Sequence, residues 1–147
     1  MNIKEFHARH GLKAYGTVAN SWDAFGSTGV VLMQLWQAPK QRVREHAIPG
    51  AYLRVRCFDA AHSEANGQRQ AVGYAGRHKS IEAIKQGAKG FAALSAPPTE
   101  VEHGPGVWAK YADLQRVFPI LGIESAGNGD IFAILGAGVP ASQMTAA

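Results

Sequence analysis

Seven residues from Val30 to Trp36, with the sequence VVLMQLW, form an almost unbroken apolar segment. The turn-forming sequence GSTG precedes this segment at 26–29, and Ala38-Pro39 follows it. An apolar run of this length between turn signals predicts a strand that is covered on both faces, because a strand with one wet face would alternate apolar and polar residues. We therefore expect a central strand with a packed layer on each side.

Other segments also have the character of strands. SWDAF at 21–25 pairs with the apolar run in a predicted hairpin, and PILGIES at 119–125 pairs with DIFAILG at 130–136 in a second, where Asn-Gly favours the turn. FAALSA at 91–96 predicts one more strand. In AYLRVRCF at 51–58, apolar and polar residues alternate as in a half-buried strand. This pattern predicts one face with Leu53, Val55 and Cys57 in the core, and an opposite face with Tyr52, Arg54, Arg56 and Phe58.

Two segments predict helices. Asn2, Glu5 and Gly11 supply capping signals for a short helix over 2–10, and RHKSIEAIKQGAK has an apolar stripe at Ile81 and Ile84 that favours a helix over about 78–89. Residues 59–76 are rich in Gly, Ala, Asn and Gln and predict a long loop. The predicted fold class is α+β, with a mixed, mainly antiparallel sheet that could curl into a partial barrel.

The length of 147 residues predicts a single domain over 1–147, with a frayed tail from about 137. The chain has one cysteine, and its N-terminal segment lacks the apolar run of a secretory signal. The longest apolar stretch is too short to cross a bilayer. We therefore expect a soluble cytoplasmic protein with no membrane association, and the sequence leaves its oligomeric state open.

The positive charge is concentrated in the middle of the chain. Ten Lys or Arg residues and four acidic residues lie between Lys40 and Lys89, so this stretch carries a net charge of +6, whereas the rest carries −2. A basic stretch of this kind favours a polyanionic partner, although it could equally be a solvated surface.

Motifs for common chemistries are absent from the sequence. GAGVPA at 136–141 looks like a dinucleotide fingerprint, but only six residues follow it, too few for the helix that such a site needs. The six histidines show no zinc-ligand spacing, and there is no second cysteine to support a metal site. We expect no metal site and no cofactor.

The remaining signal is a set of basic side chains with aromatic residues between them. Strand alternation places Arg54 and Arg56 on one face, and the expected start of the helix brings a second group of cations to its N-terminus, where an anion is favoured. The candidate phosphate- or nucleic-acid-binding residues are Arg42, Arg44, Arg54, Arg56, Arg77, His78 and Lys79. The candidate stacking or pocket residues are Trp22, Trp36, Tyr52, Phe58 and Tyr74. Arginines beside exposed aromatic rings suit both phosphates and unstacked bases.

The series NSWDAFGSTGVVLMQLWQ, GRHKSIEAIKQGAKGFAAL and LGIESAGNGDIFAIL resembles a group of small bacterial proteins associated with restriction, defence and mobile-element neighbourhoods. The resemblance extends from Asn20 to Leu135 and includes no motif specific to a catalytic activity. It implies a DNA-directed role.

The first functional hypothesis is a small bacterial domain that binds nucleic acid through a basic, aromatic-lined face. A second is an enzyme for a nucleotide or another phosphorylated substrate, with Asp23, His78 or Asp59 as its acid–base group. A third is an interaction module of a mobile element that binds an acidic protein. The sequence does not decide whether the protein is an enzyme.

Overall fold

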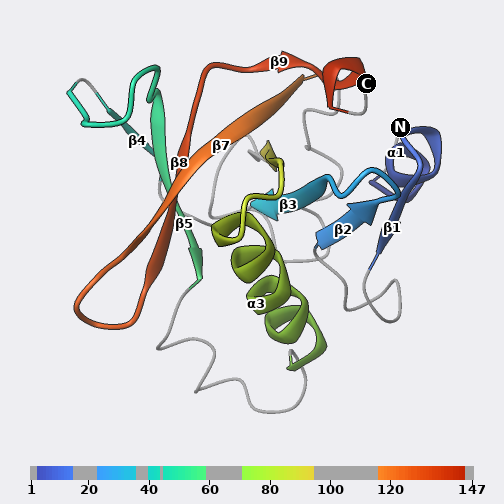
Figure 1. Ribbon diagram of the computed structural model, residues 1–147, viewed down its shortest axis with the longest axis horizontal. Helices are drawn as coiled ribbons and strands as arrows, with labels where there is room; N and C mark the ends of the chain where they lie inside the picture. The colour runs from blue at the N-terminus through green and yellow to red at the C-terminus, as the bar shows by residue number, and fades with distance from the viewer. Residues whose placement is uncertain are drawn as a thin grey trace, which may run out of the picture.

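A computed structural model of the chain describes residues 3–14, 23–35, 40–43, 45–58, 71–94 and 116–144 (Figure 1). Its helices are α1 (Ile3–Arg9), α3 (Ala71–Lys85) and a short 3-10 turn (Ala141–Gln143). Its strands are β1 (Leu12–Ala14), β2 (Asp23–Gly26), β3 (Val31–Leu35), β4 (Lys40–Arg42), β5 (Leu53–Phe58), β6 (Gly90–Leu94), β7 (Arg116–Ser125), β8 (Ile131–Leu135) and β9 (Val139–Pro140).

The strands form one mixed sheet in the order β1-β2-β3-β6-β7-β8-β5-β4, and β9 pairs with β7 beside this path. Only β3 and β6 pair in parallel; every other described pair is antiparallel. The predicted α+β class and mainly antiparallel sheet are therefore confirmed. The described strands do not close into a barrel, since β1 and β4 are the two ends of their order.

Strand β7 joins the two halves of the sheet. Its beginning pairs with β9 and β6, whereas its end, from Ile120 to Ser125, pairs with β8. A bulge between Ile120 and Gly122 leaves Leu121 as an extra residue that is exposed, and such bulges increase the local twist of a strand. In Figure 1, β4, β5 and β8 lie on one side, β1, β2 and β3 lie on the other, and α3 crosses in front between them.

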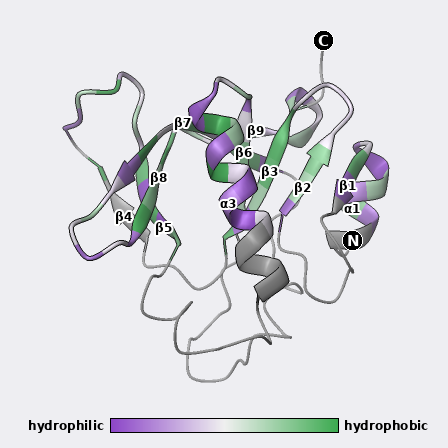
Figure 2. Cartoon of the chain, turned by 60° about the horizontal axis from the view of Figure 1, so that its bottom comes forward, coloured by the Kyte–Doolittle hydropathy of each residue, from purple (hydrophilic) through white to green (hydrophobic). Residues whose placement is uncertain are grey.

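The central strands separate two hydrophobic cores. On β3, Leu32 packs into the first core with Phe6 of α1 and Met144 near the C-terminus, whereas Met33 packs into the second core with Ile81 of α3. Every residue of β3 is buried, and Figure 2 shows this strand as strongly hydrophobic. The predicted burial on both faces is confirmed, and each such large side chain contributes about 1.5–3 kcal/mol to folding.

The second core lies between α3 and the curved sheet. It contains Val55 and Cys57 of β5, as the alternation in AYLRVRCF predicts, together with Ala133 and Leu135 of β8. Both predicted hairpins are present: β2 pairs with β3, and β7 pairs with β8.

Two predictions about segment boundaries are wrong. Helix α3 begins at Ala71, so residues 71–76 are helical instead of forming the end of a loop, while 59–70 lie outside the described residues. The C-terminal segment is not frayed up to Met144, because β9 pairs with β7 and both Ala141 and Met144 are buried in the first core. In both places tertiary packing outweighs a local composition of small residues.

Candidate functional site

The predicted basic residues lie on two sides of the sheet. Val55 and Cys57 face α3 in the second core, so Arg54 and Arg56, which alternate with them, lie on the opposite side. Arg77 belongs to α3 and is buried on the near side. We call the side of β5, β8 and β7 that faces away from α3 the outer face. Arg77 and the two β5 arginines therefore do not form one basic surface.

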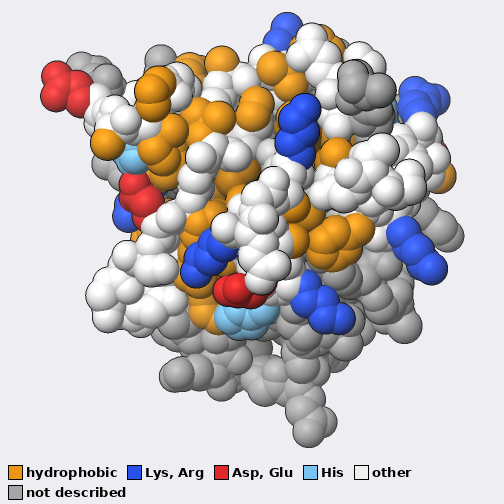
Figure 3. Space-filling view, viewed as in Figure 1, with side chains coloured by type: hydrophobic (Ala, Val, Ile, Leu, Met, Phe, Trp, Pro, Cys, Tyr) orange, Lys and Arg blue, Asp and Glu red, His pale blue; other side chains and the backbone are white. Residues whose placement is uncertain are grey.

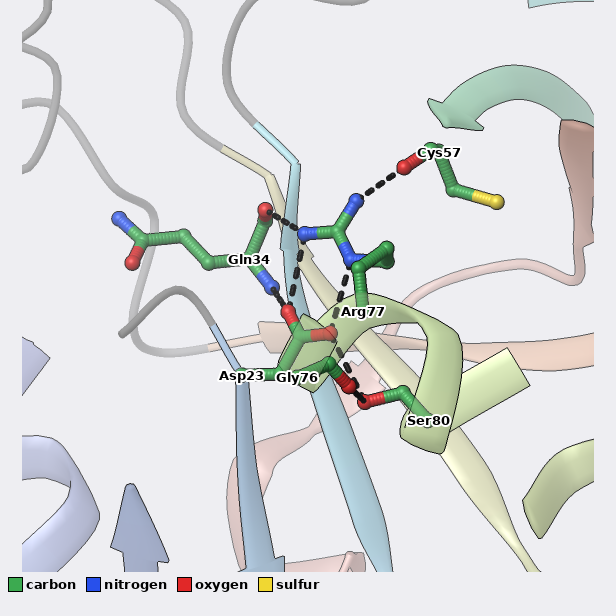
Figure 4. Close-up of polar contacts among 6 residues, drawn as sticks. All are labelled: Asp23, Gln34, Cys57, Gly76, Arg77 and Ser80. Carbon is green, nitrogen blue, oxygen red and sulfur yellow. Dashed lines mark hydrogen bonds and ion pairs between the residues drawn. The ribbon is translucent and has the colours of Figure 1, made fainter. Parts of the chain in front are cut away.

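Arg77 lies at the centre of a buried polar network (Figure 4). Its Nε and Nη2 donate to the two carboxylate oxygens of Asp23, at 2.8 and 2.9 Å. Nη2 also donates to the backbone oxygen of Gln34 at 2.9 Å, and Nη1 donates to the backbone oxygen of Cys57. These contacts join α3 to the start of β2 and to the ends of β3 and β5.

Asp23 is as fully engaged as Arg77. Besides the arginine, it accepts hydrogen bonds from the Ser80 hydroxyl at 2.8 Å and from the backbone N–H of Gln34 at 3.3 Å. The side chains of Asp23 and Arg77 are only 1% and 5% exposed. A buried charge is stable only when it is paired and hydrogen-bonded, and this network supplies both conditions.

This geometry differs from the predicted phosphate-binding role of Arg77 and from the predicted acid–base role of Asp23. Arg77 lies in the second turn of α3, not at the helix N-terminus as predicted, and its guanidinium donates to a carboxylate and to two backbone oxygens inside the protein. Asp23, a candidate acid–base group of the enzyme hypothesis, is held in the same ion pair. The network therefore has the features of a structural connection between the helix and three strands.

A second polar cluster lies on the outer face, around Glu124 of β7. Its Oε1 is 2.5 Å from His46 Nε2, and its Oε2 is 3.2 Å from Arg54 Nε. The guanidinium carbon of Arg54 lies 3.6 Å from the centre of the Phe132 ring, a stacked cation–π geometry. About a third of each of the Arg54 and Glu124 side chains is exposed. The side chains of this cluster are therefore fixed by contacts within the protein and are also partly exposed to solvent.

The hydrogen bonds assign the tautomer of His46. The backbone N–H of Ile48 donates to Nδ1 at 3.0 Å, so Nδ1 is unprotonated, and the proton on Nε2 is donated to Glu124. Both ring nitrogens are engaged. This arrangement orients the carboxylate and leaves His46 without a nitrogen to act as a general base.

The hydrogen bond from His46 is the main reason that the pKa of Glu124 is lowered from its usual value. Burial acts in the opposite direction, and the hydrogen bond from Arg54 adds to the lowering. Glu124 is therefore an ionised carboxylate at neutral pH, and it acts only as a hydrogen-bond acceptor.

Arg56 is also placed beside a carboxylate. Its Nη1 lies 3.7 Å from Asp130 Oδ2, and 30% of its side chain is exposed. Asp130 belongs to the turn between β7 and β8, where its backbone N–H bonds to the Asn128 side chain. Arg54 and Arg56 are thus partly neutralised by neighbouring acids, a feature that reduces their attraction for phosphate.

Phe58 does not share the face of Arg54, contrary to the prediction. A bulge between Arg56 and Phe58 sets two residues of β5 opposite one residue of β8, so the alternation is interrupted. Phe58 packs instead against the second core, and its ring lies 4.7 Å from that of His78 on α3. His78 and Lys79 are exposed on the helix.

The other candidate binding and stacking residues lie in less well defined surroundings or outside the described residues. Tyr52 directly precedes β5 and is half-buried. Arg42 lies on β4 and Tyr74 lies on α3, and their side chains are outside the described part of the structure. The candidates that lie outside the described residues are Arg44, Trp22, Trp36 and Asp59.

Sequence reasoning missed His46, Glu124, Asp130 and Phe132. The Asn-Gly turn carries a signal for part of this cluster, since the hairpin register places Glu124 opposite Phe132. The sequence carries no comparable signal for the pairing of β8 with β5, and this pairing brings Arg54 to both residues.

In the described part of the chain, no helix is long and apolar enough to cross a membrane. Within the same residues, no three His, Cys, Asp or Glu side chains are grouped so that they could hold a metal ion. The chain matches no protein-family model, no curated protein and no solved structure. The resemblance to restriction and mobile-element proteins therefore stays a prediction.

Proposed function

We propose that the protein binds single-stranded nucleic acid, DNA in the first instance, on the outer face of its sheet. The observation that carries the proposal is the stack of Arg54 on Phe132, at 3.6 Å and about one-third exposed. A guanidinium held flat against a ring is a ready surface for an unstacked base, and the planes of arginine side chains are used in this way in nucleic-acid recognition.

The neighbourhood of the stack supports the same proposal. Arg56 lies next to Arg54 along β5 on the outer face, with 30% of its side chain exposed, and can reach a phosphate on either side of the base. Glu124 and Asp130 fix the positions of the two arginines, so little side-chain entropy is lost on binding. A duplex does not offer its base faces, and we therefore expect a preference for single strands.

The wider charge distribution favours the approach of a polyanion. Lys79, Lys85 and Lys89 are exposed on the side of α3, where Glu82 is an exposed acid. Figure 3 shows Lys and Arg side chains distributed over this side of the molecule, with fewer acidic groups. These cations lie across the sheet from Arg54, so they contribute to long-range attraction instead of direct contact with the same base.

The experiment is fluorescence anisotropy with labelled single- and double-stranded DNA over a salt series. If Arg54 and Arg56 each neutralise one phosphate, the logarithm of the binding constant should fall with the logarithm of salt concentration with a slope of roughly −1.4. Loss of stacking should weaken binding by about 5- to 150-fold, so Arg54→Ala and Phe132→Leu should both bind single strands poorly.

Lys85→Ala is the matched control, because it removes one positive charge on the other side of the sheet. We expect it to change single-strand affinity by less than about twofold, since a distant exposed charge is largely screened. The proposal is wrong if single strands do not bind even at low salt, or if Lys85→Ala weakens binding as much as Arg54→Ala does.

A further inference from the structure

Glu124 lies at the edge of the Arg54 stack. The Nε–H bond of a guanidinium lies in the guanidinium plane, and Arg54 donates this hydrogen to Glu124 Oε2 at 3.2 Å. The carboxylate is therefore close to the plane of the guanidinium, while Phe132 covers one of the faces of that plane. A base stacked on the other face would have its edge near Glu124.

The carboxylate keeps capacity for further hydrogen bonds. Two ionised oxygens offer about four acceptor positions, and the hydrogen bonds from His46 and Arg54 use one position on each oxygen of Glu124. With 36% of its side chain exposed, Glu124 can accept hydrogen bonds from a bound molecule. His46 and Arg54 hold it from two sides, so its orientation is fixed before any ligand arrives.

We infer that the outer face selects guanine, with Glu124 accepting hydrogen bonds from the edge of a base stacked on Arg54. This inference rests on the proposed binding of single-stranded nucleic acid. A carboxylate that only accepts needs donors, and guanine presents two adjacent donors, N1–H and the N2 amino group, which match two carboxylate oxygens. Cytosine and adenine present one amino group beside an acceptor, and thymine presents one N–H between two carbonyl oxygens.

The test compares short single strands that differ in one base. The probes are labelled oligo-dT strands of about six nucleotides, a length within the usual site size, with dG, inosine, dA or dC at one central position. Inosine lacks the N2 amino group but keeps the rest of the guanine ring system. A good bidentate contact discriminates by about 5- to 150-fold, so we expect the dG strand to bind about tenfold more tightly than the inosine strand.

Glu124→Gln is the decisive variant, and Glu82→Gln is its matched control. Both replace a carboxylate by an amide of the same size, but Glu82 is exposed on α3, across the sheet. Glu124→Gln should reduce the ratio of dG to inosine affinity to within about twofold, and this ratio is the readout because a loss of Arg54 positioning alone would weaken both strands equally. Glu82→Gln should keep the original ratio.

Three results would overturn the inference, and they differ from one another. Equal affinity for dG and inosine strands in the unmodified protein, with measurable binding of both, would leave the nucleic-acid proposal intact and remove base selection. An equal loss of affinity for every strand in Glu124→Gln would make Glu124 a positioning residue for Arg54 only. No binding of any strand at low salt would overturn the proposed function itself.

Discussion

Replacement of Asp23 by Asn should destabilise the protein more than any change to its exposed ion pairs. The amide keeps the shape of the side chain but removes its charge, and Arg77 then remains charged in a site where only 5% of its side chain is exposed. Removal of one partner from a buried pair costs about 3–5 kcal/mol, because the other charge is left without compensation. Asp23 also accepts from Ser80 and from the Gln34 backbone, and an amide nitrogen cannot accept in those positions.

This loss of about 3–5 kcal/mol is large compared with the free energy of unfolding of a whole domain, which is about 5–15 kcal/mol. Urea unfolding followed by far-ultraviolet circular dichroism measures it. With a slope of about 2 kcal/mol per molar urea, a loss of about 4 kcal/mol lowers the midpoint by about 2 M. The double variant Asp23→Asn/Arg77→Met should be less destabilised than the sum of its two single variants, because it no longer contains the unpaired buried cation.

Arg56→Gln is the matched control, since it breaks an ion pair with a 3.7 Å separation in which 30% of the arginine is exposed. Its cost should be below about 1 kcal/mol. If Asp23→Asn costs no more than this control, the pair between Asp23 and Arg77 is hydrated in solution, and the structural role assigned to the network is wrong.

Two further predictions concern ionisable groups in the cores. Burial is the main cause that lowers the pKa of His7 below 6.5, and Asp23 acts in the opposite direction. As the pH falls, His7 is therefore protonated in the unfolded chain before it is protonated in the folded protein. The free energy of unfolding should therefore decrease from pH 7 to pH 5, and this decrease can be followed by the urea midpoint. The decrease should be smaller in His7→Leu, and an identical decrease in the variant would contradict the explanation. Burial also raises the pKa of the Cys57 thiol to about 11 from 9.0, with Arg77 partly opposing the rise, and at pH 8 this leaves about a hundredfold less thiolate. A thiol reagent should therefore modify the native protein far more slowly than the urea-unfolded chain, and equal rates would show that Cys57 is not buried.

The hairpins and the central strand could be predicted because their signals are local. The apolar run at 30–36 has no polar alternation, and Asn128-Gly129 favours a turn whatever the rest of the chain does. The side chains of Val55 and Cys57 point into the core because successive side chains of a strand alternate between its two faces. Each of these predictions needs only neighbouring residues and general preferences of the backbone.

The start of α3 depends on tertiary structure. Gly73 and Gly76 lower helix propensity by about 1 kcal/mol each relative to alanine, and the composition of 71–76 therefore predicts a loop. In the folded protein this segment is helical and leads directly into the buried turn of Arg77 and Ser80, whose contacts with Asp23 outweigh the local preference.

The sequence by itself determined the layers of the fold, the buried face of β5 and the excess of positive charge in its middle. The tertiary structure alone decided what each arginine does. Asp23 and Arg77 are 54 positions apart in the chain, and Arg54 and Glu124 are 70 apart. Contacts over such separations depend on the strand order, and no local period encodes that order. The guanidinium of Arg77 is therefore buried and joins the helix to three strands, whereas that of Arg54 stacks on a ring and is partly exposed to solvent.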